Sequence, residues 1–277
     1  MIRKVIDNSM LQSIDLQRYL SASPAHFAVL PDFVAIESYK VASVDEILKR
    51  WEIISQFPRQ ALVLKDTGKI CGLRGRGRGL QARLVDHKQT AEFPKFCADL
   101  RHTRAGDERY QRALLQLSNA AQREIATVSG LVPRVMESRR KLAETYTQAE
   151  ARVIRSQQQL PQSLTVKFVR NVCLLFWMFM RQHPQVRDLP KTFDEGCNLY
   201  LFRFSLCVHI WMLEWIAGGS NEQTNEARVR NDLIDLQVAT YGTYFDGLMT
   251  ADDKMKYIHA LARFMHETMR AEPLPPS

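Results

Sequence analysis

Short apolar segments recur at both ends of the chain, and each is bordered by residues that favour turns. They are only four or five residues long, which suits buried strands better than helices. They are Ile2–Ile6, Phe27–Leu30, Ala61–Leu64 and Gly247–Thr250. Segments with apolar residues at helical spacing lie between them, among them Met10–Leu20 and Val44–Gln56. Strands that alternate with helices form parallel sheets covered by helices. We therefore predict an α/β fold with a parallel sheet flanked by helices.

The middle of the chain lacks such strands and has the composition of helices. Asp107–Leu160 is rich in Ala, Gln, Glu, Arg and Leu, and Pro133 is its clear interruption, so we predict two long polar helices there. Two apolar helices are expected at Phe168–Met180 and Leu199–Ala217. Near the C-terminus, helices are predicted at Arg228–Tyr241 and Lys254–Arg270, followed by a disordered tail with the sequence AEPLPPS.

The apolar segments do not have the pattern of membrane spans. The longest uncharged one, Val172–Met180, is nine residues long, whereas a spanning helix needs roughly 20. The start of the chain has no apolar run typical of a signal peptide. The five cysteines form no CxxC pair, which favours free thiols in a reducing compartment. We predict a cytoplasmic protein that does not associate with membranes.

The chain is basic, and much of its charge lies in one glycine-rich segment. The net charge is +8, and a basic surface attracts polyanions. Residues 69–88 contain six basic residues and one acidic residue, with four glycines among residues 72–79, so we expect a flexible loop. Arginine grips phosphate with two parallel hydrogen bonds, and we predict RNA contacts for Arg74, Arg76, Arg78 and Arg83. A solvated charged loop is the alternative, because no aromatic platform for stacking bases adjoins it.

Acidic residues lie at the predicted strand ends and on the helices beside them. Asp7 ends the first strand, and Glu37 lies in a helix that begins at Pro31. Asp232 and Asp235 are one helical turn apart, and Asp252 follows the last strand. The carboxyl ends of neighbouring parallel strands line one crevice. Residues from the two ends of the chain are therefore expected to meet.

Several carboxylates in one crevice repel each other unless a cation neutralises them. Mg²⁺ and Mn²⁺ prefer hard oxygen ligands and can activate a water for attack on a phosphodiester. Each acid also has an ordinary explanation. Asp7 could end a strand or cap a helix, Glu37 could be solvated, and Asp232 could complement a helix dipole. Asp252 could occupy a turn.

These segments together resemble the PIN-domain superfamily. The resemblance rests on VIDNS, VLPDFVAIESYK, NDLIDLQVATYG and DGLMTADDK, which cover less than a third of the chain. It implies a parallel sheet flanked by helices and a metal-dependent nuclease that cuts RNA, as a toxin, a defence effector or a processing enzyme. Its metal ligands would be Asp7, Glu37 and Asp252, with Asp232 or Asp235 from the late helix. Thr250 and Asn8 would support them.

The same resemblance implies a discontinuous domain organisation. Residues 1–90 and 221–270 would form the PIN-like domain, residues 91–220 a helical insertion, and residues 271–277 a disordered tail. The expected cofactor is Mg²⁺ or Mn²⁺, and the expected partner is RNA, with single-stranded DNA as a second possible substrate. The helical region could also hold a homodimer interface or bind an inhibitory protein.

Two other functions compete with the nuclease. A non-catalytic RNA-binding or scaffold protein could keep the fold without cleaving. A phosphatase of haloacid-dehalogenase type also begins with a strand that ends in Asp, but it needs a second Asp two residues later. Ser9 occupies that position, which argues against the phosphatase.

Overall fold

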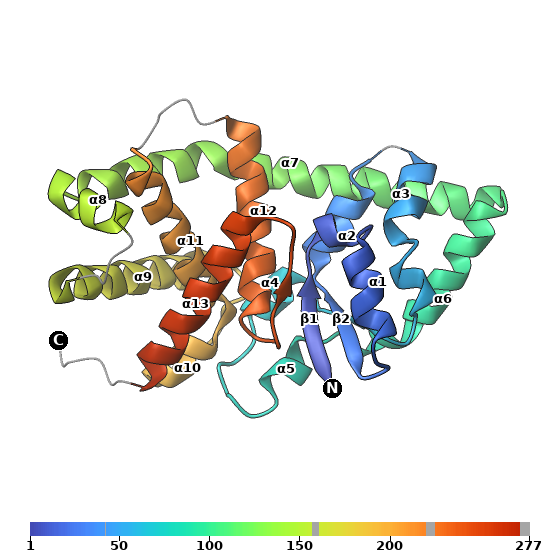
Figure 1. Ribbon diagram of the computed structural model, residues 1–277, viewed down its shortest axis with the longest axis horizontal. Coiled ribbons are helices and arrows are strands. Elements are labelled where there is room, and N and C mark those ends of the chain that lie inside the picture. The colour runs from blue at the N-terminus through green and yellow to red at the C-terminus, as the bar shows by residue number, and fades with distance from the viewer. Residues whose placement is uncertain (42, 157–160, 220–224, 272–277) are drawn as a thin grey trace.

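A computed structural model describes residues 1–41, 43–156, 161–219 and 225–271, with one sheet inside a largely helical chain (Figure 1). The strands are β1 (Ile2–Ile6), β2 (His26–Leu30), β3 (Ala61–Val63) and β4 (Leu248–Met249). Their order in the sheet is β3-β2-β1-β4, and every neighbouring pair is parallel. The prediction of an α/β fold with a parallel sheet flanked by helices is confirmed.

β1 lies between β2 and β4, although β4 comes almost at the end of the sequence. Val5 pairs with Val29 on one side and with Leu248 on the other. Val5 and Ile6 are fully buried, as expected for a strand covered on both faces. Asp7 therefore leaves the sheet at the middle of its carboxyl edge.

The helices next to the sheet begin where side chains can cap them. Helix α1 (Ile14–Ser21) begins after Ser13, whose hydroxyl accepts a hydrogen bond from the Asp15 N–H. It therefore starts later than the predicted Met10, and η1 (Asn8–Met10) is a short 3-10 turn. Helix α2 (Asp32–Tyr39) directly follows β2 and carries Glu37.

The next predicted helix, Val44–Gln56, is divided in two. Helix α3 (Val44–Trp51) begins after Ser43, whose hydroxyl accepts from the Glu46 N–H. It ends at Trp51, and the short 3-10 helix η2 (Ile54–Gln56) follows before β3.

The segment predicted as a flexible loop is part helix and part loop: residues 72–79, which contain its four glycines, lie between two helices and belong to neither. Residues 69–88 contribute to α4 (Thr67–Cys71), α5 (Leu80–Leu84) and the start of α6 (His87–Arg104). The Arg83 guanidinium donates hydrogen bonds to the carbonyl oxygens of Arg78 at 2.6 Å and Arg74 at 3.3 Å, and also to that of Arg76. One arginine therefore organises the backbone between α4 and α5.

The long polar helix of the middle region continues through its proline. Helix α7 (Glu108–Glu144) contains Pro133, and α8 (Gln148–Arg155) follows it. An interior proline costs about 3 kcal/mol. Val128 and Val132 are buried in the turn that precedes Pro133, and we attribute the continuation of the helix to their packing. The predicted interruption at Pro133 was therefore wrong, whereas two polar helices are present.

The remaining helices form a layer beside the sheet (Figure 1). They are α9 (Gln162–Gln182), α10 (Phe193–Asn198), α11 (Tyr200–Ala217), α12 (Glu226–Gly242) and α13 (Asp253–Ala271). Helix α7 runs along one side of the molecule, from α3 and α6 to α8 and α11 (Figure 1). A single hydrophobic core joins the sheet and the helices. The predicted disordered tail falls almost wholly on residues 272–277, outside the described part of the chain.

One helix of the described chain, α9, is long and apolar enough by length and composition to cross a membrane. Core helices meet the same criteria, and α9 packs along α11, where the rings of Phe176 and Phe202 lie 5.5 Å apart. All five cysteines are free thiols.

Candidate metal centre

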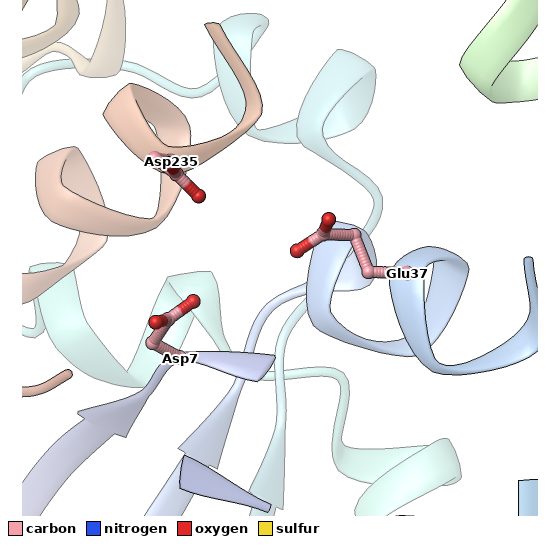
Figure 2. Close-up of side chains that lie close together, drawn as sticks. All are labelled: Asp7, Glu37 and Asp235. Carbon is pink, nitrogen blue, oxygen red and sulfur yellow. The ribbon is translucent and has the colours of Figure 1, made fainter. Parts of the chain in front are cut away.

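Three carboxylates from distant parts of the chain converge at the carboxyl edge of the sheet. Asp7 follows β1, Glu37 lies on α2 and Asp235 lies on α12, and Figure 2 shows the three side chains pointing toward one another. One oxygen of each lies within 4.8 Å of the others. Such a set of hard oxygen atoms can hold a divalent cation with water completing its coordination.

Asp7 is held in place by neighbours from both ends of the chain. Its backbone N–H donates to the Met249 carbonyl oxygen at 2.9 Å. The hydroxyls of Ser9 and Thr250 donate to its Oδ2 at 2.5 and 2.8 Å. Within the described chain no hydrogen bond reaches its Oδ1. One carboxylate oxygen is therefore fixed, and the other is available to a ligand.

Glu37 is buried and balanced by a nearby cation. The Lys40 ammonium donates to Glu37 Oε1 at 3.0 Å. The Arg50 guanidinium donates to the Glu37 carbonyl oxygen at 2.8 Å and so ties the end of α2 to α3. Lys40 is about one-third exposed, which places a positive charge at the rim of the cluster.

Asp235 has the most perturbed carboxyl of the group. Burial, followed by the charges of Asp7, Glu37, Asp232 and Asp252, raises the pKa of Asp235 to about 8. Near neutral pH this side chain keeps its proton as long as no cation is present. A divalent ion at the three oxygens would supply the opposite charge and favour the ionised form.

Asp232 lies one turn away from Asp235 but makes other contacts. The Trp211 indole N–H donates to its Oδ2 at 2.9 Å, and the Lys254 ammonium forms an ion pair with its Oδ1. Of the two candidate acids on α12, the structure brings Asp235, and not Asp232, into the three-carboxylate cluster.

Asp252 lies near the cluster without joining it. Its side chain is exposed, and its Oδ1 accepts a hydrogen bond from the Met255 N–H at 3.1 Å, at the start of α13. Its charge still contributes to the raised pKa of Asp235. In this conformation Asp252 caps α13, whereas the ordinary explanation given for it was a turn.

The supporting residues are only partly those that the sequence indicated. Thr250 contacts Asp7 directly, whereas the buried Oδ1 of Asn8 has no hydrogen-bond partner among the described residues. Ser9 and Lys40 were missed as supporting groups. The signal for Ser9 was its place two residues after an acid at a strand end. For Lys40 it was the spacing of three residues from Glu37 on one helix, which allows an ion pair.

The four arginines of the glycine-rich segment do not share one role. Arg74 forms an ion pair with Asp188 at 3.0 Å, and Arg83 binds backbone carbonyl oxygens. Arg76 and Arg78 are exposed and free for other contacts. The segment between α4 and α5 lies towards the end at which β1 begins, whereas Asp7 lies where β1 ends (Figure 1). The segment that carries these arginines therefore lies away from the carboxylate cluster.

Comparison with known proteins finds no relative of this chain. No protein-family model matches the chain, and no curated protein or solved structure matches it significantly.

Proposed function

We propose that this protein is a metal-dependent endoribonuclease of PIN type. The observation that carries the proposal is the convergence of Asp7, Glu37 and Asp235 to within 4.8 Å at the carboxyl edge of a parallel sheet. Each acid comes from a different element, so the cluster is a product of the tertiary fold. Its donor set suits Mg²⁺ or Mn²⁺.

The residues around the cluster fit this proposal chemically. Bound Mg²⁺ or Mn²⁺ would supply activation of a water and neutralisation of the phosphodiester charge. Ser9 and Thr250 orient Asp7, and burial together with the neighbouring carboxylates raises the pKa of Asp235, which a bound cation would offset. Lys40 is exposed enough to contact a phosphate once Glu37 has another cation.

The test is cleavage of a fluorescently labelled single-stranded RNA by the purified protein. Cleavage is expected with Mg²⁺ or Mn²⁺ and is expected to stop on addition of a chelator. Asp7→Asn and Asp235→Asn should each lower the rate by at least about a hundredfold, because each removes a charged ligand from the cluster. A labelled DNA of the same sequence tests the preference for RNA.

Asp253→Asn is the matched control, since Asp253 is exposed and its ion-pair partner in the described chain is Lys256. It should cleave like the parent. Calorimetric titration with Mn²⁺ tests the metal site without reference to activity. Equal cleavage by the parent and by both cluster variants would refute the proposal.

The second candidate is a non-catalytic RNA-binding protein with the same fold. It is favoured by the exposed Arg76 and Arg78. They belong to the segment between α4 and α5, which lies towards the end at which β1 begins (Figure 1). On this alternative the protein binds RNA without cutting it, and the cluster variants bind as well as the parent.

A further inference from the structure

The outer face of α9 is an apolar strip that nothing in the described chain covers. Val166 and Leu174 are 54% and 59% exposed, and Trp177 and Met178 are 39% and 37% exposed. The opposite face of the helix is buried and contains Val172, Phe176 and Met180. A helix with one buried and one exposed apolar face is typical of a binding surface.

Two arginines lie on the same strip as these apolar side chains. Arg170 precedes Leu174 by four residues, and Arg181 follows Trp177 by four, so helical periodicity aligns all four on one face. Neither arginine forms an ion pair with another described residue, and α9 contains no acidic residue. The strip therefore has an apolar centre with an unpaired cation toward each end.

An apolar cavity opens beside the centre of this strip. Its volume is about 300 Å³. Its walls include Cys173, Phe176, Trp177, Pro190, Phe193 and Phe202. Cys173 and Trp177 belong to α9, so the cavity is continuous with the strip. A concave apolar cavity suits an aromatic or leucine side chain that protrudes from a partner.

We propose that this face of α9 binds an acidic amphipathic helix of a partner protein. One apolar side chain of the partner would fill the cavity, and carboxylates toward its two ends would pair with Arg170 and Arg181. This is the helix-in-groove mode of recognition. The surface lies in the helical layer, to one side of the sheet and its carboxylates (Figure 1), so the proposal is independent of the nuclease assignment.

Two other occupants fit the surface less well. A second copy paired antiparallel about the centre of Leu174 and Trp177 would place Arg170 opposite the Arg181 of that copy, and like charges repel. A lipid bilayer is contacted by protruding apolar side chains, whereas the centre of this surface is hollow. The arginines and the cavity together favour a negatively charged helix.

The test is selection of partners from a display library of amphipathic helical peptides on the intact protein. The enriched peptides should carry an aromatic residue or leucine between acidic residues. Leu174→Ser and the double variant Arg170→Glu/Arg181→Glu should each weaken their binding by at least about tenfold. Exchanging the peptide carboxylates for lysines should restore binding to the double variant.

Leu115→Ser is the matched control, because Leu115 is 40% exposed on α7, and it should leave binding unchanged. The proposal is overturned if no peptide is enriched, or if the enriched peptides are not acidic. It is also overturned if Leu174→Ser abolishes a dimer seen by light scattering, which would assign the face to a second copy. If Leu174→Ser loses binding to phosphatidylserine vesicles, the outer face of α9 contacts a membrane, and the proposal is likewise overturned.

Discussion

At the scale of single residues, the sequence could not predict which of Asp232 and Asp235 joins the carboxylate cluster. The two acids are one turn apart on one helix, so periodicity places both near the same surface. Trp211 and Lys254 engage Asp232, and they come from α11 and α13. Asp235 is left facing Asp7 and Glu37. Such tertiary contacts are not visible in the local pattern that suggested both residues.

The raised pKa of Asp235 makes a prediction about stability. The side chain titrates near its ordinary value when unfolded and at about 8 when folded. From about pH 4 to about pH 8 the folded state therefore retains a proton that the unfolded state loses, and stability falls as pH rises. The Asn side chain of Asp235→Asn stays neutral at every pH. In the presence of a chelator, the melting temperature of this variant should therefore exceed that of the parent, and the difference should grow as the pH rises from about 4 to about 8.

Thermal melts followed by circular dichroism measure this margin. Below about pH 4 the two proteins should differ little, because the carboxyl is then neutral in both states. Mg²⁺ should stabilise the parent and not the variant. Parallel melting curves over the whole pH range would contradict the assignment of a strongly shifted carboxyl to Asp235.

At the scale of elements, the short strands were easier to predict than the glycine-rich segment. β1 has the bounds that its apolar run predicted, and β2 begins one residue earlier than expected. Residues 69–88 were predicted to be a flexible loop because four glycines fall within residues 72–79. Their order depends on contacts distant in sequence, such as the bond from the Asn198 amide to the Gly75 carbonyl oxygen at 3.0 Å.

Gly75 provides a test of that packing. A Cβ atom added at this position would lie 1.9 Å from the backbone oxygen of Glu195, so Gly75→Ala forces two backbone segments apart. We expect a loss of about 1–3 kcal/mol in the free energy of unfolding, as for overpacked cores. Gly77→Ala is the control, because its added Cβ would come no closer than 3.6 Å to Asn198. Denaturant unfolding measures both, and equal stabilities would refute close packing at Gly75.

At the scale of the whole molecule, the meeting of the two chain ends was predictable and the place of the arginines was not. Parallel strands share one carboxyl edge, which is why the ends of the first and last strands were expected to meet. In the structure the Thr250 hydroxyl donates to Asp7 although 243 positions separate the two residues. The segment after α4 leaves that edge and returns toward the amino ends of the strands (Figure 1). Its path follows from packing against α10, for which the composition of the loop holds no signal.

This separation predicts that RNA binding and RNA cleavage respond differently to the exposed arginines. Among the residues that the structure describes, the guanidinium groups of Arg76 and Arg78 make no hydrogen bond or ion pair. Arg76→Ala/Arg78→Ala therefore removes two candidate phosphate contacts without breaking a bond seen in that part of the chain. For single-stranded RNA, each lost contact reduces the slope of log K against log salt concentration by about 0.7. The double variant should therefore bind long RNA with a slope shallower by about 1.4.

A tetranucleotide that occupies only the carboxylate crevice should be cleaved at the parental rate, because the segment that carries the arginines lies at the other end of the strands. Fluorescence anisotropy over a salt series measures the slope, and gel analysis measures cleavage. An unchanged slope would show that the arginines do not contact RNA, and slower cleavage of the tetranucleotide would show that they act at the carboxylate site.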